Sequence, residues 1–333
     1  VVSSHEVCPL QGLLGRSHTT VVDASLTPTL QDSIRAMRAT MPEATLEFMQ
    51  SSGGLTAAEG FRGSRAILSG PAGGIVGAVA VAGSMGNIIT FDMGGTSTDV
   101  AWHDGTFHRR WDSKVDGIPL RVPMLDIHTI AAGGGSICRF DGQRLRVGPE
   151  SSGAQPGPAC YRGGGPATVT DCHVVLGRLD ADLLPTVFGP DRTQSIDPDA
   201  SRASFSAMAE QVRASGRSPM SIEQLAEGCL RIAVERMAGA VRKISIEQGR
   251  SLDGVTLVSF GGAGGQTACL VAEALGIRRV LVHPHAGVLS ALGIGLATPS
   301  LSTERTVSCA IDSDEILTSF KDMESALHES LVQ

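Results

Sequence analysis

The sequence contains little lysine. Only Lys114, Lys243 and Lys321 occur among 333 residues, so a phosphate site built on lysine has few candidates. The formal net charge is −7, and the chain therefore lacks the basic excess with which proteins bind nucleic acids or anionic membranes. We expect neither nucleic acid nor a membrane surface as a main partner.

Cysteine spacing typical of zinc sites is also missing. The seven cysteines are scattered, odd in number and without a CxxC pair, which argues against a structural zinc site and a disulfide framework. No apolar run approaches membrane-spanning length, and no signal sequence opens the chain. These absences predict a protein of a reducing compartment, the cytoplasm.

Glycine, by contrast, is abundant. The chain has 41 glycines, 16 prolines and a hydrophobic content of 42%, which is typical of a loop-rich α/β protein. Its length is sufficient for two or more domains, each with its own core. The first residue is not an initiator methionine, and we expect residues upstream of it.

The segment Ile88–Val100, IITFDMGGTSTDV, predicts a strand, a glycine turn and a return strand. Such a hairpin presents backbone N–H groups and the hydroxyls of Thr96, Ser97 and Thr98, an arrangement that suits a phosphate. Asp92 and Asp99 flank the turn and suit a hydrated divalent cation. A hairpin of the same sequence without any ligand is an equally good interpretation of this motif alone.

The preceding segments predict a lobe and a connecting helix. Thr19–Met41 has helical periodicity, and Pro28 is expected to bend or restart this helix. Thr45–Gln50 predicts a strand. Ser69–Ala82 predicts a helix of small residues that Pro71 opens.

Two glycine-rich stretches follow the hairpin. Gly133–Gly135, within an alternation of short apolar runs and turns, is either a second anion-binding turn or an ordinary flexible one. Val147–Asp171 is a long Gly/Pro segment, and we expect an ordered loop that lines a site. Within it, Cys160 is expected to be a small buried residue. His128 and His173 lack metal-ligand spacing and are expected to be structural.

The C-terminal third is more regular. Ser221 and Gln224 predict a capping box for a helix that extends to Ile244 and stops by Gly249. A buried strand, Val255–Phe260, then leads into the turn Gly261–Gly265. This turn matches neither the Rossmann nor the P-loop spacing, but its exposed N–H groups suit a nucleotide. Three further elements are predicted: a helix at Gln266–Leu275, a strand at Arg279–His283 and a helix at Gly287–Ala297.

Two glycine-rich elements after buried strands, with two small-residue helices, together resemble the α/β fold of the actin/Hsp70/sugar-kinase (ASKHA) ATPases. That resemblance implies that residues 1–85 form the C-terminal part of a first lobe with a crossing helix. Residues 86–298 would form the second lobe, with a Gly/Pro-rich insertion at about 113–200, and residues 299–333 would begin a C-terminal segment. The fold is then expected to be incomplete at its N-terminus.

Longer motifs are similar to the hydantoinase A/5-oxoprolinase family, and most of all to its ATP-dependent 5-oxoprolinases. The similarity extends over about Val1 to Ala297. The motifs are SGPAGGIVGA (Ser69–Ala78), FDMGGTSTDV (Phe91–Val100), LDIHTIAAGGGS (Leu125–Ser136), VGPESSGAQPGPACYRGGG (Val147–Gly165), TVTDCHVVLGRL (Thr168–Leu179), VFGPDRTQSIDPDAS (Val187–Ser201) and SFGGAGGQTACLVAEALGI (Ser259–Ile277).

The resemblance implies hydrolysis of a cyclic amide with ATP: 5-oxo-L-proline would become L-glutamate, a reaction of glutathione metabolism, as ATP becomes ADP and phosphate. The implied cofactors are ATP and Mg²⁺. The implied partner is a hydantoinase B-like subunit or domain, in a homo- or hetero-oligomer.

The resemblance also implies roles for individual residues. Asp92, Thr96 and Asp99 are the candidates for catalysis, with Asp92 as the metal ligand. The candidates for ATP binding are Gly94, Gly95, Thr96, Ser97 and Thr98 on the hairpin and Gly261, Gly262, Gly264 and Gly265 on the adenosine side. The candidates for contact with the lactam are Asp126, Gly134, Gly135, Ser136, Glu150, Tyr161 and Asp171.

The sequence departs from the family pattern in three respects. It lacks a second phosphate motif, DxGGTFxD, which the family carries on an upstream lobe, and it lacks the hydantoinase B-like half. His128 and His173 stand where many members have asparagine, and imidazole has a different donor and acceptor pattern. Three interpretations therefore stay open: part of a 5-oxoprolinase, a sister enzyme that acts on hydantoins, other lactams or ketones, and a nucleotide-binding or assembly module inactive alone.

Overall fold

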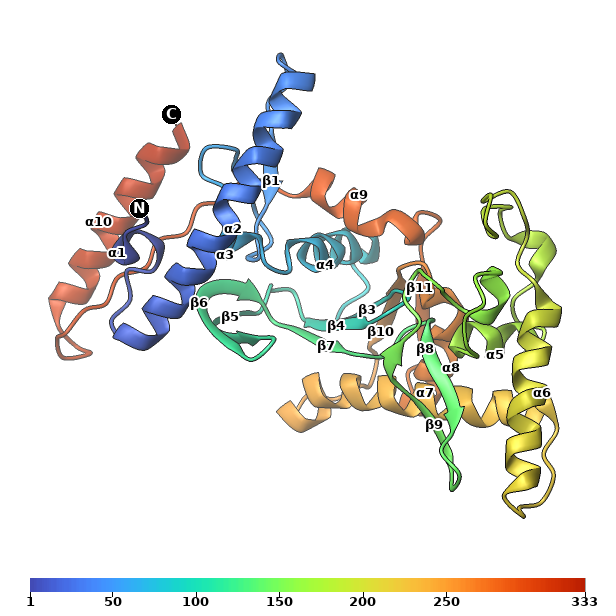
Figure 1. Cartoon of the computed structure of the whole chain (residues 1–333). Coiled ribbons are helices and arrows are strands. Elements are labelled where there is room, and N and C mark those ends of the chain that lie inside the picture. Colours follow the sequence, from blue (N-terminus) through green and yellow to red (C-terminus); the bar gives the residue numbers. More distant parts are fainter. Residues whose placement is uncertain (333) are drawn as a thin grey trace. The chain divides into compact units, whose positions relative to one another are not determined.

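The computed structural model describes residues 1–332, which divide into two units (Figure 1). The first unit contains Val1–Gly77, Phe107–Asp126 and the residues from Ser290 onward, and the second contains Ala78–Thr106 and Ile127–Leu289. The units are discontinuous in sequence, because the hairpin of residues 107–126 and the residues from Ser290 onward belong to the first unit.

That hairpin lies against a long helix of the first unit. Strands β5 (Arg109–Val115) and β6 (Ile118–Leu125) pair antiparallel, and the buried side chains of β6 pack against Val22 of helix α2 (Leu13–Thr40). The Thr19 hydroxyl of α2 also accepts a hydrogen bond from the Arg121 N–H, at 2.9 Å. These contacts join residues 107–126 to the N-terminal part of the chain.

Helix α2 extends over Leu13–Thr40 and contains Pro28. The sequence-based prediction of a helix here is confirmed, but the helix begins six residues earlier and Pro28 does not divide it. The other elements of this unit are α1 (Ser4–Val7), β1 (Glu47–Met49), β2 (Leu55–Ala57), α3 (Gly63–Ala66) and α10 (Asp314–Val332).

Two small-residue helices, α4 (Ser69–Ala82) and α9 (Leu289–Leu296), were both expected from the sequence. Their segments in the first unit pack closely through glycine. A Cβ atom added to Gly293 would lie 1.9 Å from the Gly73 carbonyl oxygen, and one added to Gly73 would lie 2.9 Å from the Ser290 carbonyl oxygen. Only glycine permits this approach of two helix backbones.

The second unit is built on a five-stranded sheet in the order β11-β10-β3-β4-β7. Strand β10 (Thr256–Phe260) is buried along its whole length and runs parallel to both β3 (Ile88–Met93) and β11 (Arg279–Val282). Strands β4 (Thr98–His103) and β7 (Ile127–Ile130) extend the sheet antiparallel. The predicted hairpin and buried strand are confirmed, and both lie at the centre of this sheet.

Helices α7 (Ile222–Ile244) and α8 (Gly264–Leu275) pack on this sheet and on each other (Figure 1). The predicted capping box of Ser221 and Gln224 is present, and the apolar stripe of α7 is part of the main core. Gly249, with a φ of +74°, ends a separate 3₁₀ turn at Ile246–Gln248 and not α7 itself.

The Gly/Pro-rich region of the second unit is ordered. It contains the hairpin of β8 (Ser136–Phe140) and β9 (Leu145–Ser151), the 3₁₀ turns Ala159–Tyr161 and Ala181–Leu183, and helix α5 (Val169–Val175). Helix α6 (Pro198–Ala214), which was not predicted from the sequence, follows it and is capped by the Asp197 side chain.

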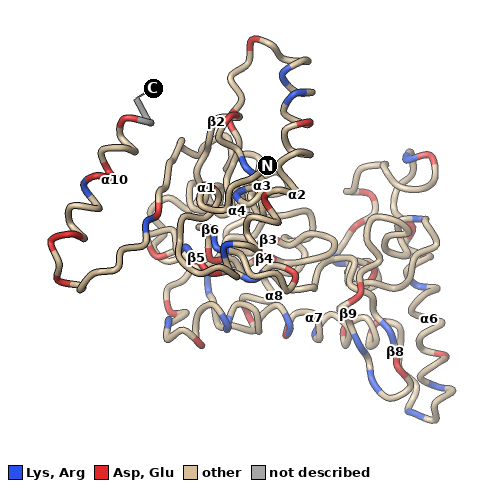
Figure 2. Tube along the Cα trace, turned by 60° about the vertical axis from the view of Figure 1, so that its left-hand side comes forward, with Lys and Arg blue, Asp and Glu red and all other residues tan. Residues whose placement is uncertain are grey.

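Charged residues are distributed over both units (Figure 2). None of the helices within residues 1–332 combines the length and the apolar character needed to cross a membrane.

Candidate functional site

The hairpin of β3 and β4 places two carboxylates side by side. Asp92 and Asp99 are direct cross-strand partners, and both are partly buried. Between the strands, the Gly94 N–H donates to the Ser97 carbonyl at 3.0 Å and closes the turn. The predicted turn therefore carries both acidic residues on the same face of the sheet.

The two carboxylates are electrostatically strained. Burial, followed by the charge of Asp99, raises the pKa of Asp92 to about 6. Burial also raises the pKa of Asp99, although a hydrogen bond from the Thr129 hydroxyl partly opposes the rise. Like charges opposite each other destabilise a sheet, and a cation between them would remove that repulsion.

The donor set suits a magnesium ion that keeps most of its water. The Asp92 carboxylate makes no hydrogen bond or ion pair with any residue in the described part of the chain. No cluster of three or more His, Cys, Asp or Glu residues able to hold a metal occurs within residues 1–332. Mg²⁺ is usually bound by one or two carboxylates together with water and phosphate oxygens, and Asp92 and Asp99 match that pattern.

The hydroxyl residues of the turn divide into two groups. Thr96 is exposed and Ser97 is partly exposed, so both are accessible to a ligand. Thr98 is fully buried, and its hydroxyl donates to the Ala132 carbonyl at 2.6 Å. We expected Thr98 to bind phosphate, but its side chain fixes the hairpin to the segment that follows β7.

The triple-glycine turn packs directly on the phosphate hairpin. The N–H groups of Gly134 and Gly135 donate to the carbonyls of Gly94 and Gly95, at 3.0 and 2.6 Å. A Cβ atom on Gly133 would lie 2.6 Å from the Gly94 oxygen, so the contact requires glycine. Ser136 is buried, and its hydroxyl accepts from the Gly133 N–H. The N–H groups of Gly133, Gly134 and Gly135 therefore already have acceptors. The turn supports the hairpin, and its contact with a lactam stays a prediction.

The second glycine-rich turn lies on the other side of Asp92. Gly261 has a φ of +83°, and a Cβ atom there would lie 2.5 Å from both Asp92 Oδ1 and the Met93 carbonyl oxygen. The Ala263 N–H donates to that same Met93 oxygen at 2.9 Å. The structure therefore brings together three segments that are far apart in sequence: residues 92–99, 133–136 and 261–265.

Helix α8 begins at Gly264, two residues earlier than predicted, so Gly264 and Gly265 form its first turn. No side chain caps this end, and Gly262 and Gly265 face open space. The Gly264 N–H bonds to the Gly261 carbonyl at 3.3 Å. The N–H groups of Gly262 and Gly265 are therefore the candidates for phosphate, which helix N-termini bind well. In a parallel sheet, ligands bind at the carboxyl ends of the strands, which is where β3 and β10 end here.

Asp171, a predicted lactam contact, lies in the core. It is fully buried, completes the capping box of α5 with Thr168, and accepts hydrogen bonds from the N–H groups of Ala159 and Cys160. The Ser201 hydroxyl also donates to it, at 2.6 Å. Asp171 thus holds the Gly/Pro segment in place. Cys160 is buried, as predicted.

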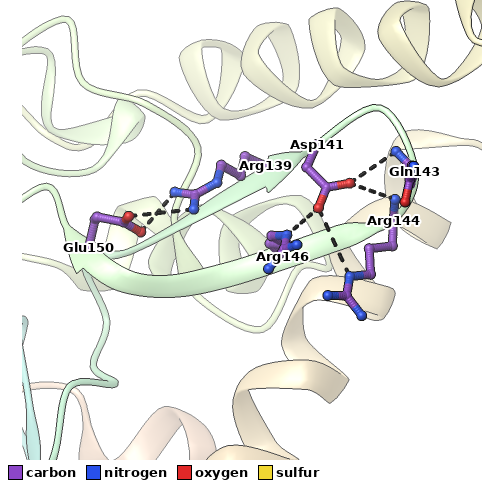
Figure 3. Close-up of polar contacts among 6 residues, drawn as sticks. All are labelled: Arg139, Asp141, Gln143, Arg144, Arg146 and Glu150. Atoms are coloured by element: carbon purple, nitrogen blue, oxygen red, sulfur yellow. Dashed lines mark hydrogen bonds and ion pairs between the residues drawn. The ribbon is translucent and has the colours of Figure 1, made fainter.

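The other predicted lactam contacts are dispersed. Tyr161 packs on Phe188, with ring centroids 4.5 Å apart, and lines a cavity of about 620 Å³. Glu150 is exposed and pairs with Arg139 across the β8–β9 hairpin (Figure 3). Asp126 belongs to the first unit and pairs with Arg110 there. Within the second unit, Glu150 is not among the residues that line the cavity beside Tyr161.

Ser151 and Thr129 were missed from the sequence. The Ser151 hydroxyl donates to the Gly95 carbonyl at 3.4 Å, whereas its neighbour Glu150 faces Arg139. Successive strand residues point to opposite faces. This alternation along β9 is the sequence signal that separates Ser151 from Glu150. Thr129 is paired with Asp99 in the sheet, which only the strand order reveals.

His173 is structural, as predicted, although only one of its nitrogens has a partner. It is fully buried on α5, and its Nε2 lies 3.3 Å from the Thr267 hydroxyl of α8. No residue of the described chain contacts its Nδ1 by hydrogen bond. Burial, with the nearby charge of Arg178, lowers its pKa to about 4, so it is neutral at physiological pH.

Comparison with known proteins gives a consistent result. The family model for hydantoinase/oxoprolinase matches residues 16–302. The 5-oxoprolinase of Saccharomyces cerevisiae is 42% identical over 301 residues, which cover 88% of this chain and 23% of that protein.

Two solved structures are similar over nearly the whole chain. The crystal structure of the ATP-dependent caprolactamase from Pseudomonas jessenii matches with a TM-score of 0.83 at 32% identity, over 98% of this chain and 48% of that one. Caprolactamase subunit alpha from the same organism is 36% identical over 307 residues, covering 88% of this chain and 42% of that protein. A nucleotide-free acetone carboxylase, from work on ATP-dependent acetone carboxylation, matches with a TM-score of 0.76 at 25% identity, again over 98% and 48%. The chain spans about a quarter of the length of the first curated relatives it matches.

Proposed function

The chain belongs to the hydantoinase/oxoprolinase family, and we propose that it supplies part of the ATP and phosphoryl-transfer site of an enzyme that hydrolyses a cyclic amide. The proposed substrate is 5-oxo-L-proline, the product L-glutamate, and the cofactors ATP and Mg²⁺. The proposed fold is of the actin/Hsp70/sugar-kinase type, with the phosphate hairpin and the adenosine-side turn both on the second unit.

One observation carries the proposal. Two glycine-rich backbone segments and a pair of partly buried carboxylates meet at the carboxyl ends of β3 and β10. Open N–H groups supply donors for phosphate oxygens, and acidic side chains supply ligands for a cation. Both are what phosphoryl transfer requires, because its catalysis consists mostly of positioning and charge neutralisation.

The chemistry follows from the low reactivity of the amide. Resonance makes a lactam carbonyl a poor electrophile, so phosphorylation of its oxygen by ATP is needed to form an imidate that water can attack. After water adds to the imidate carbon, cleavage of the ring C–N bond, with a proton passing to the nitrogen, gives an acyl phosphate. A second water hydrolyses this acyl phosphate to the amino acid and phosphate. In this reaction a bound Mg²⁺ would neutralise the phosphate charge.

The residues of this chain would bind and orient the nucleotide. Asp92 and Asp99 would hold the hydrated cation. The exposed Thr96 and Ser97, with the backbone at Gly95, would hold the phosphates. The N-terminus of α8, with Gly262 and Gly265, would hold the nucleotide from the adenosine side. Gly261 keeps this turn close to Asp92.

The test is substrate-dependent release of ADP. We would measure it for the chain alone and with a hydantoinase B-like partner, with 5-oxoproline, hydantoin, caprolactam and acetone as substrates. The proposal expects release that depends on 5-oxoproline and rises with the partner. Preference for caprolactam or a hydantoin would assign a different substrate to the same reaction, the ATP-dependent hydrolysis of a cyclic amide.

Two alternatives give different outcomes in the same assay. Ketone carboxylation is suggested by the similarity to acetone carboxylase, and it predicts ATP turnover that requires both acetone and bicarbonate. A nucleotide-binding or assembly module that is inactive alone predicts no release in any mixture, although a folded chain still binds ATP.

A further inference from the structure

A second cavity of the second unit is lined by arginine. It has a volume of about 670 Å³ and lies between strand β9 and helix α7. Arg144 and Arg146 line it from the β8–β9 hairpin, and Arg231 and Arg236 line it from α7. No acidic residue is among the described residues that line this cavity, in a chain with a net charge of −7.

The two walls of this cavity are held against each other. Gly228 of α7 lies so close to β9 that a Cβ atom there would be 2.9 Å from the Leu145 side chain. The Arg236 guanidinium donates a hydrogen bond to the Val147 carbonyl. The cavity is therefore a fixed feature of the packing between β9 and α7.

One carboxylate beside the cavity compensates part of its charge. Asp141 pairs with Arg146 and, more distantly, with Arg144 (Figure 3). The hydrogen bond from Arg146, with those from the backbone N–H groups of Arg144 and Gln143, holds the pKa of Asp141 well below its usual range, so it stays ionised. Four arginines line this cavity against one aspartate beside it, and Arg231 also lines a neighbouring cavity with Glu227, Glu235 and Glu273.

The remaining guanidinium groups have donors available. Arg231 makes no ion pair with any residue in the described part of the chain, and Arg236 bonds only to a backbone carbonyl there. Arg144 has 70% of its side chain exposed. Guanidinium groups bind phosphate and carboxylate with paired hydrogen bonds, and cavities of about 300–1,000 Å³ are typical of small-molecule sites.

We propose that this cavity binds a small polyanion that carries two or more phosphate or carboxylate groups. The site is separate from the nucleotide site proposed above, because none of residues 92–99, 133–136 or 261–265 lines it. The proposal does not depend on the reaction that the protein catalyses.

Isothermal titration calorimetry at low ionic strength tests the proposal, with inorganic tripolyphosphate and citrate as separate probes. The test variant is the double substitution Arg144→Gln/Arg231→Gln. Its matched control is Arg202→Gln/Arg213→Gln on α6, which removes the same charge from exposed side chains that pair with Glu223 and Glu210. All four arginines are exposed, so melting temperatures should match that of the wild type.

We expect at least one probe to bind the wild type and the control, and the test variant to bind it roughly 10- to 100-fold more weakly, because two charged contacts are lost. The stronger probe identifies the preferred anion as phosphate or carboxylate. Equal affinity in the test variant and the control would overturn the proposal. Binding of an acidic polypeptide but of neither small probe would also overturn it, in favour of a protein partner.

Discussion

Gly261 offers the sharpest test of how the site is built. Its φ of +83° is costly for any residue with a side chain, and the Cβ of an alanine would lie 2.5 Å from Asp92 Oδ1 and from the Met93 carbonyl oxygen. We therefore expect the substitution Gly261→Ala to push the glycine turn away from Asp92.

The size of the effect follows from these contacts. The left-handed backbone costs alanine about 1–2 kcal/mol, and disturbance of the Ala263–Met93 hydrogen bond costs about 1 kcal/mol more. A total of about 2–3 kcal/mol lowers the melting temperature of a domain of this size by roughly 4–12 °C. Nucleotide affinity should fall as well, because the turn and Asp92 no longer lie together.

Gly287→Ala is the matched control. Gly287 has open space around an added methyl group and no positive φ. Circular dichroism melts and ATP titrations of both variants would be compared with the wild type. If Gly261→Ala melts and binds like Gly287→Ala, the proposed close packing of the glycine turn on Asp92 is incorrect.

Three further predictions concern charged and hydroxyl groups. The folded-state pKa of Asp92 is raised to about 6, so the folded state holds this proton more tightly than the unfolded state does. In cation-free buffer the free energy of unfolding should therefore fall by up to about 3 kcal/mol as pH rises from about 4 to 6. Urea titrations should show a smaller fall for Asp92→Asn. Thr129→Val removes the hydroxyl that donates to Asp99 and should raise the Mg²⁺ concentration needed for ATP binding roughly 3- to 10-fold, whereas Thr129→Ser should not. Asp171→Asn disrupts a buried hydrogen-bond network and should cost about 3 kcal/mol or more in urea unfolding, while exposed Glu150→Gln should stay within about 0.5 kcal/mol.

Local patterns predicted the centre of the second unit well. The β-branched run at Ile88 and the buried run at Val255 gave the two central strands, because such runs are typical of strands covered on both faces. The capping box at Ser221 placed the start of α7, because its hydrogen bonds are local. The glycines at residues 94–95 and 261–265 marked both nucleotide-binding candidates.

Features that depend on distant contacts were not predictable in this way. The hairpin 107–126 belongs to the first unit through its packing on α2, which no local pattern encodes. Pro28 did not interrupt α2, although its local preference favours a break. Asp171 was predicted to contact the lactam, yet its hydrogen bonds with Ala159, Cys160 and Ser201 make it a buried support of the loop.

The glycines at residues 133–135 show the same limit. The sequence indicated a turn that exposes N–H groups, but these groups bond to the carbonyls of Gly94 and Gly95. Glycine is needed there for the close approach of two backbones. Only the three-dimensional arrangement distinguishes the two uses of the same residue.

The most direct test of the account is calorimetric titration of ATP into the wild type and Asp92→Asn, with and without Mg²⁺. The exposed substitution Asp253→Asn serves as the control for loss of one negative charge. We predict Mg²⁺-dependent binding in the wild type and the control, and its loss in Asp92→Asn with an unchanged circular dichroism spectrum. Unchanged Mg²⁺-dependent affinity in Asp92→Asn would contradict the assignment of the β3–β4 hairpin as the nucleotide and metal site.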